Sequence, residues 1–145
     1  QMKILIFGLP GSGKTTLARE LSYHFLLPHH NADVYREKFI DWDFTHRGRE
    51  RQAFRMSRQW GILDFVCPTN EFRNIVNPDY TIFMNTIHEG RFEDTNKLFE
   101  QPISCDCEIK KWIEPNQLRN SLADFNRGIE GIQNFLKERL NTLAK

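Results

Sequence analysis

Residues 8–16, "GLPGSGKTT", decide the fold of this 145-residue chain. They follow the apolar run "KILIF" (3–7) and lead into "LARELSYHF" (17–25), whose apolar residues recur at helical spacing. Three glycines and one proline among residues 8–13 argue against regular structure between these two segments. The stretch therefore predicts a buried strand, a pliable loop and a helix in direct succession.

This loop fits the phosphate-binding pattern G-x-x-x-x-G-K-[ST] at every position. Glycines let the main chain turn so that successive N–H groups line a hollow for an anion, and the helix N-terminus adds unpaired donors. Lys14 then offers a cation to the β- and γ-phosphates, and the Thr15 hydroxyl offers a ligand to Mg²⁺. A glycine-rich turn that binds nothing is the alternative, but the flanking strand and helix favour phosphate binding. We expect ATP and Mg²⁺ as cofactors, with the nucleotide held by Gly8, Pro10, Gly11, Ser12, Gly13, Lys14, Thr15 and Thr16.

Strand-like and helix-like segments alternate along the rest of the chain. Strands are expected within residues 3–7, 29–33, 61–68, 79–85 and 105–112, and helices within 15–26, within 51–60 and from Ser121 onward. This alternation predicts an α/β fold with three layers, α/β/α, around a five-stranded parallel sheet. We expect residues 1–145 to form a single domain, with the ligand at the carboxyl ends of the strands.

Composition limits the classes of partner. The net charge is +1, so nothing draws the whole chain toward nucleic acid or a membrane. No apolar run approaches the roughly 20 residues of a membrane span, and no secretory signal pattern is visible. Cys67, Cys105 and Cys107 are too few and odd in number for a disulfide framework, which favours the reducing cytoplasm. The C-x-C pair is read as thiols on a strand, because no second pair completes a zinc site.

The phosphate loop alone leaves the reaction open. The N-K-x-D motif by which GTPases read their base is missing, and the loop reads G-K-T-T where adenylate kinases usually read G-K-G-T. The chain is also small for a motor or an assembly ATPase. A compact small-molecule kinase and a non-catalytic nucleotide sensor remain.

Further blocks resemble the adenylylsulfate kinases, which phosphorylate the 3′-hydroxyl of adenosine 5′-phosphosulfate with ATP. The family motif D-G-D-x-x-R is similar to "NADVYR" (31–36), and D-L-G-F-S-x-x-D-R-x-x-N-x-R-R is similar to "DWDFTHRGRERQAFR" (41–55). The motif F-I-S-P-Y-R-x-x-R is similar to "FVCPTNEFR" (65–73), and "NKLFEQP" (96–102) resembles pieces of the family's lid. The resemblance runs from the first strand to about Phe83 and implies a phosphotransferase of sulfate assimilation.

The chain departs from this family mainly where the acceptor would bind. Asn31 replaces the first Asp of D-G-D, Gln52 replaces an Asn, and Thr69-Asn70 replaces a Tyr-Arg pair that the family uses around its substrate. The expected lid, about residues 88–104, is short. The acceptor is therefore either the sulfated nucleotide, a relative of it, or another hydroxyl compound such as a nucleoside or a modified nucleic-acid base.

The resemblance and the residue chemistry together indicate an acceptor site. Asp33 follows the second strand, where a carboxylate can hold Mg²⁺ through water or accept the proton of the attacking hydroxyl; a helix N-cap is the alternative. Arg36 and Arg49 carry forked guanidinium groups that match phosphate or sulfate, against the alternative of a solvated helix face. Our predicted substrate contacts are Asp33, Arg36, Phe44, Arg49, Arg73, Lys97 and Phe99.

Three further interpretations concern the lid and the remaining acids and histidines. Arg91 and Lys97 would close over the nucleotide from the lid and stabilise charge on the moving phosphoryl group, or else belong to an exposed loop. Asp64 in "GILDFV" is a candidate for the magnesium-binding acid, but a structural carboxylate is favoured. The neighbours His29 and His30 point to opposite faces of a strand, so no role is assigned to them.

The sequence as a whole predicts a kinase that transfers the γ-phosphoryl group to a small nucleotide-like acceptor, foremost adenosine 5′-phosphosulfate. Lys14 and Asp33 are the predicted catalytic residues, Thr15 and Asp33 the predicted metal ligands, and Arg91 a predicted nucleotide contact. A nucleoside or polynucleotide kinase and a non-catalytic regulator are the alternatives. A small-molecule partner is expected, without a membrane partner and with nucleic acid disfavoured, and homodimer formation is left open.

Overall fold

A five-stranded sheet organises the computed structural model, which describes residues 1–145. All of its strand pairs are parallel, in the order β2-β3-β1-β4-β5. The strands are β1 (Lys3–Phe7), β2 (His29–Asn31), β3 (Gly61–Asp64), β4 (Tyr80–Met84) and β5 (Cys107–Ile109). The predicted parallel sheet is confirmed, and "CDCEIKKW" (105–112) does supply an edge strand.

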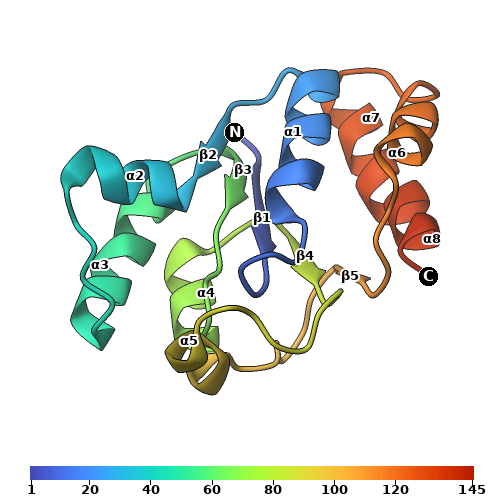
Figure 1. Cartoon of the computed structure of the whole chain (residues 1–145). Helices are drawn as coiled ribbons and strands as arrows, with labels where there is room; N and C mark the ends of the chain where they lie inside the picture. The colour runs from blue at the N-terminus through green and yellow to red at the C-terminus, as the bar shows by residue number, and fades with distance from the viewer.

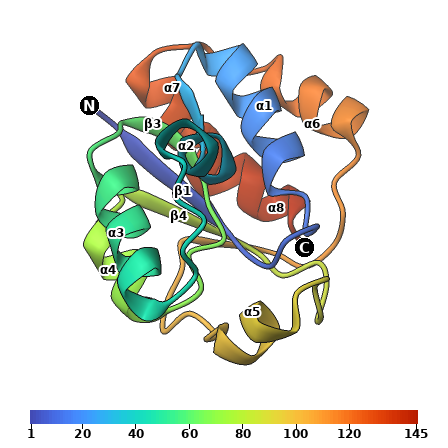
Figure 2. The same ribbon diagram turned by 60° about the vertical axis from the view of Figure 1, so that its left-hand side comes forward.

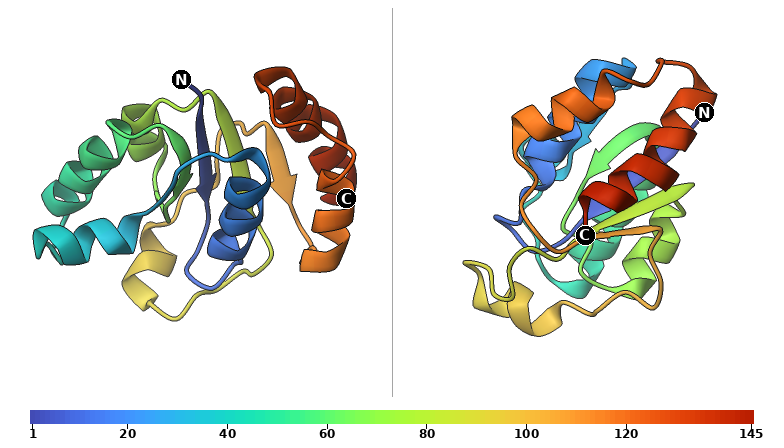
Figure 3. Two further views of the ribbon diagram at one scale, coloured as in Figure 1. Left: turned by 90° about the horizontal axis from the view of Figure 1, so that it is seen from above. Right: turned by 90° about the vertical axis from the view of Figure 1, so that its right-hand side faces the viewer.

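Helices cover both faces of this sheet (Figure 1). They are α1 (Lys14–Phe25), α2 (Ala32–Phe39), α3 (His46–Ser57), α4 (Asn70–Val76), α5 (Glu93–Leu98), α6 (Pro115–Leu122), α7 (Ile129–Asn134), the π-helical stretch η1 (Phe135–Leu140) and α8 (Asn141–Leu143). Seen from above in Figure 3, the sheet lies between the α3 side and the C-terminal helices. None of the helices has both the length and the apolar character needed to cross a membrane.

The alternation of side chains along β1 divides the core into two halves. Ile4 and Ile6 belong to the larger half, which packs against α1 and the C-terminal helices. Leu5 and Phe7 belong to the other half, which packs against α3 and α4. Because β1 is buried on both faces, its sequence is a continuous apolar run without polar alternation.

The prediction of one continuous C-terminal helix from Ser121 onward is wrong, both in where the helix starts and in its being unbroken. Ser121 lies near the end of α6, and a turn over residues 123–128 precedes α7. A Cβ atom at Gly131 would collide with the main chain of Asn126, so this turn packs directly on α7 and requires glycine there. The apolar spacing survives the break because α6, α7 and η1 all contribute residues to the same half of the core.

The carboxyl ends of the central strands converge on one edge of the molecule. The phosphate loop follows β1 at this edge, α2 begins directly after β2, and Asp64 ends β3. Figures 1 and 2 place α5 beyond the same edge, facing the phosphate loop. The fold thus collects residues from distant parts of the sequence at the place where open parallel sheets bind ligands.

Candidate active site

The phosphate loop leaves the N-terminus of α1 open to a ligand. Gly13 is the N-cap of this helix with φ of 101°, and no side chain caps the helix end. The first N–H groups of a helix have no partner within it, so they remain available to an anion. A Cβ at Gly13 would also collide with the ring of Trp112. The positive φ and the close packing of this ring therefore both require glycine at position 13.

Lys14 is held over this loop. Its side chain is 8% exposed, and its Nζ donates a hydrogen bond to the Leu9 carbonyl at 2.9 Å. Burial lowers the pKa of Lys14, whereas the charges of Asp64 and Asp33 oppose that change. The ammonium group is therefore placed beside the loop amides with two carboxylates near it.

Thr15 and Asp64 form the second element of the site. The Thr15 hydroxyl donates to Oδ2 of Asp64 at 2.6 Å, and the amide of Asn31 donates to the same oxygen at 2.9 Å. Burial alone would raise the pKa of Asp64, but hydrogen bonds from His29, Thr15 and Asn31 and the charge of Lys14 bring it below its usual value. A buried, ionised carboxylate thus lies directly beside the predicted magnesium ligand Thr15.

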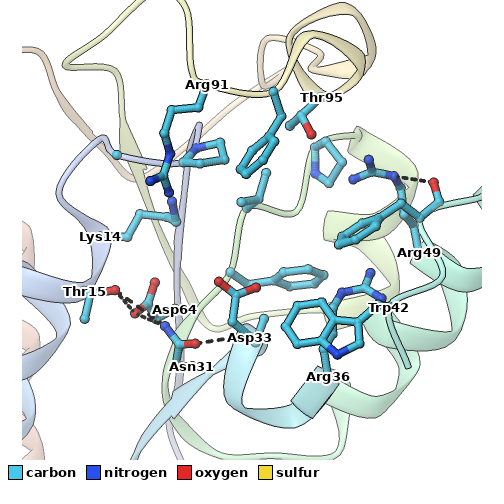
Figure 4. A pocket seen from close by; sticks show the side chains of 18 of the residues that line it. Lys14, Thr15, Asn31, Asp33, Arg36, Trp42, Arg49, Asp64, Arg91 and Thr95 are labelled. Carbon is cyan, nitrogen blue, oxygen red and sulfur yellow. Dashed lines mark hydrogen bonds between the residues drawn. The ribbon is translucent and has the colours of Figure 1, made fainter. Parts of the chain in front are cut away.

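Asp33 lies on the first turn of α2, with its carboxylate turned into the cavity (Figure 4). The N-cap of α2 is Asn31, whose Oδ1 accepts from the main-chain N–H groups of Asp33 and Val34 at 2.9 and 3.2 Å. The alternative interpretation of Asp33 as the N-cap is therefore wrong. Its exposed side chain is left free to act on a bound molecule.

Two arginines and two aromatic rings form the wall opposite the phosphate loop. Arg36 and Arg49 are 4% and 8% exposed, and burial lowers the pKa of each. Their guanidinium carbons lie 4.3 and 5.2 Å from the centroid of the Phe44 ring. Bonds to main-chain carbonyls fix the two arginines, from Nη1 of Arg36 to Asp41 and from Nε of Arg49 to Phe44, both at 2.9 Å. The other guanidinium nitrogens remain available to an anion.

These groups share one cavity of about 480 Å³. Figure 4 shows Lys14, Thr15 and Arg91 on one side of it and Arg36, Trp42 and Arg49 on the other, with Asp33 between them. The predicted residues that line it are Pro10, Gly11, Lys14, Thr15, Asp33, Arg36, Phe44, Arg49 and Arg91. The structure adds Trp42, Asp94 and Thr95, which the sequence did not indicate, and Asp64, for which a structural role was favoured.

Other predicted residues lie outside this cavity. Phe99 packs against the core and stacks on Phe83, with ring centroids 5.9 Å apart, and it does not line the cavity. The Lys97 side chain is 76% exposed and lies 4.0 Å from Glu93 on the outer side of α5. The cavity lining also lacks Gly8, Ser12, Gly13 and Thr16, which belong to the loop and helix that shape the cavity.

Arg73, which was predicted to contact the acceptor, is bound inside the protein. Its guanidinium donates to the carbonyls of Cys67, Pro68 and Glu100 at 2.7–3.1 Å and lies 4.4 Å from the Phe7 ring centroid. The side chain is 7% exposed and does not reach the cavity. Arg73, on α4, therefore joins the segment after β3 to the segment after α5, and it is not placed to contact an acceptor.

We predict that Arg73→Ala destabilises the fold and leaves the site unchanged. Three main-chain carbonyls would lose the buried group that joins them, which is expected to lower the free energy of unfolding by about 2–4 kcal/mol. Urea unfolding measures this change, and the Michaelis constant for the acceptor is expected to stay within about twofold. A raised Michaelis constant for the acceptor with an unchanged free energy of unfolding would show that Arg73 contacts the acceptor after all.

Comparison with known proteins places the fold. The sequence matches no family model and no curated protein. Solved structures do match: an APS kinase of Mycobacterium tuberculosis with AMPPNP and APS has a TM-score of 0.65 at 16% identity, covering 86% of this chain and 96% of that one. A gluconokinase of Sinorhizobium meliloti (TM-score 0.59, 10% identity, 95% of each chain) and a shikimate kinase of Aquifex aeolicus (TM-score 0.59, 17% identity, 84% and 94%) are also similar. The chain has the fold of phosphate-loop small-molecule kinases.

The likeness to the M. tuberculosis enzyme confirms the predicted resemblance to adenylylsulfate kinases at the level of the fold. At these identities it carries no statement about the acceptor. The functional conclusion must therefore come from the cavity itself.

Proposed function

We propose that this protein is an ATP-dependent phosphotransferase whose acceptor is a small anionic hydroxyl compound. The observation that carries the proposal is the cavity with a phosphate loop at one end, an arginine and aromatic wall at the other, and Asp33 between them. Such an arrangement suits transfer in line from a triphosphate to a positioned alcohol. The kinases of the same fold support a phosphotransferase over a nucleotide sensor.

Each residue has a defined task in this reaction. The loop amides and Lys14 hold the β- and γ-phosphates and stabilise the charge that develops on the transferring group. Asp33 orients the acceptor hydroxyl and takes its proton. Arg91 approaches the cavity from the segment before α5, beside Lys14 in Figure 4, and adds positive charge near the phosphates.

The residues present also fit Mg²⁺. A hydroxyl from Thr15 and carboxylates from Asp33 and Asp64 line the cavity, and Mg²⁺ is bound through oxygen. When bound with ATP, the ion would neutralise part of the negative charge of the triphosphate. Thr15 and the two aspartates would hold it directly or through water.

For the acceptor we propose adenosine 5′-phosphosulfate, phosphorylated at its 3′-hydroxyl. Arg36 and Arg49 offer guanidinium nitrogens suited to its phosphosulfate, and the partly exposed Phe44 and Trp42 offer surfaces on which a purine can stack. The three free cysteines agree with the reducing cytoplasm in which we expect such an enzyme to work.

The test is incubation with ATP–Mg²⁺ and a panel of acceptors, with products identified by mass. The panel contains adenosine 5′-phosphosulfate, nucleosides, DNA with free 5′ ends, gluconate and shikimate. A 3′-phosphorylated sulfonucleotide supports the proposed acceptor. Phosphorylation of another compound supports the phosphotransferase activity but refutes adenosine 5′-phosphosulfate as the acceptor. Tight ATP binding without any product supports a non-catalytic regulator.

We predict that Arg49→Gln raises the Michaelis constant for the anionic acceptor. Loss of charge-assisted hydrogen bonds worth roughly 1.5–3 kcal/mol corresponds to an increase of about 10- to 100-fold, with the constant for ATP little changed. The matched control is Arg58→Gln, which removes an exposed arginine that does not line the cavity. If both substitutions raise this Michaelis constant equally, Arg49 contributes only its positive charge and makes no specific contact with the acceptor.

A further inference from the structure

The acceptor end of the cavity is built partly on a short segment without helix or strand. Residues 40–45 connect α2 to α3, and Trp42 and Phe44 of this segment line the cavity. Figure 4 shows Trp42 on the same side of the cavity as Arg36. Trp42 is 52% exposed, and its ring centroid lies 6.4 Å from that of Phe44. Because the ring is only partly packed, its orientation depends on how the main chain of the segment is held.

Arg51 of α3 holds the two residues on either side of Trp42. Its Nε and Nη2 donate to Oδ2 and Oδ1 of Asp41 at 2.8 and 2.9 Å, and Nη2 also donates to Oδ2 of Asp43 at 3.2 Å. Arg55 donates to Oδ2 of Asp41 at 2.7 Å. Isolated ion pairs at a surface contribute little, but a forked arginine within a network has the geometry in which such pairs restrain a chain.

The side chains of this segment alternate between α3 and the cavity. Asp41 and Asp43 do not line the cavity, whereas Trp42 and Phe44 do. The main chain is also held from α2, because Nη1 of Arg36 donates to the carbonyls of Asp41 and Asp43 at 2.9 and 3.2 Å. Both neighbours of Trp42 are thus fixed through their side chains and their carbonyls, which restricts the directions in which the ring can point.

This arrangement falls at a departure from the resembled family. The motif D-L-G-F-S has Leu and Gly where this chain has Trp42 and Asp43. Asp43 accepts from the main-chain N–H of Thr45 at 2.9 Å and from Arg51, and a glycine could make neither contact. A Cβ at Gly48 would collide with Asp43, so the segment packs directly on the first turn of α3. The larger ring and the acid that helps to fix it therefore occur together in this chain.

We propose that Arg51, through Asp41 and Asp43, positions Trp42 as the ring that selects acceptors carrying a planar base. Arg51 does not line the cavity, so it is a positioning residue that acts through Trp42 and does not contact the acceptor. The inference rests on the proposed function, because it concerns the acceptor end of the same cavity. It places a determinant of acceptor choice outside the cavity, on the surface of α3 that faces the segment.

The test compares adenosine 5′-monophosphate with ribose 5-phosphate, of which only the first carries a base. Both are titrated calorimetrically into the full chain saturated with a non-hydrolysable ATP analogue and Mg²⁺, so that the nucleotide site is occupied. Stacking of one base on an aromatic side chain corresponds to about 5- to 150-fold in affinity, and we expect the parent to prefer the first probe by at least about 10-fold. Trp42→Leu and Arg51→Ala should each lower this preference by about 5- to 10-fold.

The preference cancels the loss of charge, because both probes carry the same phosphate. Arg47→Ala, which removes an exposed arginine of α3 that makes none of these hydrogen bonds, is the matched control and should keep the preference of the parent. Arg51→Lys keeps the charge without the fork and should retain part of the preference. Trp42→Leu combined with Arg51→Ala should prefer the base no less than Trp42→Leu alone, because Arg51 acts only through Trp42.

Fluorine NMR of the chain labelled with 5-fluorotryptophan reports on the ring itself. The resonance that is missing in Trp42→Leu belongs to Trp42, and it should shift and broaden in Arg51→Ala while those of Trp60 and Trp112 stay in place. Loss of the fold would instead change all three resonances. An unchanged preference in Arg51→Ala, a parent without any preference, or losses that add in the double variant would each overturn the proposal.

The outcomes also separate this inference from the proposed function. A preference for the base that depends on Arg51, in a chain that phosphorylates no acceptor, keeps the inference and refutes the phosphotransferase. An active kinase that shows no such preference, or that binds neither probe, refutes the inference alone. A chain that binds neither probe and phosphorylates no acceptor overturns both.

Discussion

Lys14→Ala is expected to lower kcat/KM for ATP by about 10³-fold, through both ground-state binding and stabilisation of the transferring phosphoryl group. The ammonium lies 2.9 Å from the Leu9 carbonyl, at the mouth of the loop, and a triphosphate can draw it away from this neutral acceptor. A single donor aimed at developing charge is typically worth about 10²- to 10³-fold in kcat. Weaker ATP binding adds to this loss.

The stability of the same variant gives an independent check. Because burial lowers the pKa of Lys14, the folded state bears a cost for keeping this group charged at neutral pH. This cost begins to fall as pH rises through the folded pKa and is gone above the pKa of the unfolded chain. Removing the side chain removes that cost, so Lys14→Ala is expected to melt no lower than the parent at pH 7. Loss of activity with an unchanged melting temperature would exclude unfolding as its cause.

Isothermal titration with a non-hydrolysable ATP analogue and a coupled assay of ADP release measure the two effects. Lys137→Ala removes an exposed lysine of η1 and serves as the control for loss of one positive charge. ATP binding by Lys14→Ala equal to that of the parent would falsify the phosphate loop as the nucleotide site.

The predicted residues that do line the cavity are those whose signal is local in the sequence. Lys14 and Thr15 follow from the spacing of a single loop, and the loop lies between a strand and a helix as expected. Asp33, Arg36 and Arg49 follow β2 or lie on the helices after it, and all three line the cavity. Where strand, loop and helix directly adjoin, the chain offers few ways to place such side chains.

The missed residues depend on pairing across the sheet. Asp64 reads as one acid in an apolar strand, for which a structural role was favoured over a magnesium-binding one. Its contacts with Thr15 and Asn31 arise only because β3 lies between β1 and β2. One signal was present in the sequence: an amide stands at position 31, where the related motif has an acid, and the next strand ends in a new acid. Using that signal requires the strand register, which a single sequence does not contain.

Motif matches also failed where packing decided the outcome. Arg73 and Phe99 occupy matching places in the order of the motifs, yet they pack together, with the Arg73 guanidinium carbon 5.1 Å from the Phe99 ring centroid. A buried arginine needs acceptors, and nearby carbonyls provide them within the protein. The motif matches therefore predicted which residue types occur at these positions, but not that their side chains pack inside the protein and away from the cavity.

Asp33→Asn is expected to lower kcat by about 10²- to 10⁴-fold, while ATP affinity stays within about threefold. The amide keeps the size of the side chain but cannot take the proton of the attacking hydroxyl. The helix cap is unaffected, because Asn31 accepts the main-chain hydrogen bonds of this turn. Since Asp33 is exposed, the free energy of unfolding should change by less than about 0.5 kcal/mol.

Single-turnover measurement with saturating ATP–Mg²⁺ isolates the transfer step from product release. Glu37→Gln removes an exposed acid from the same helix without touching the cavity, and its kcat should equal that of the parent. If Asp33→Asn instead weakens nucleotide binding and turnover to the same extent, Asp33 serves the ion or the triphosphate. If it changes neither, the acceptor hydroxyl must lose its proton to water or to the phosphate itself, because Asp33 is the exposed carboxylate that lies between the phosphate loop and the arginine wall.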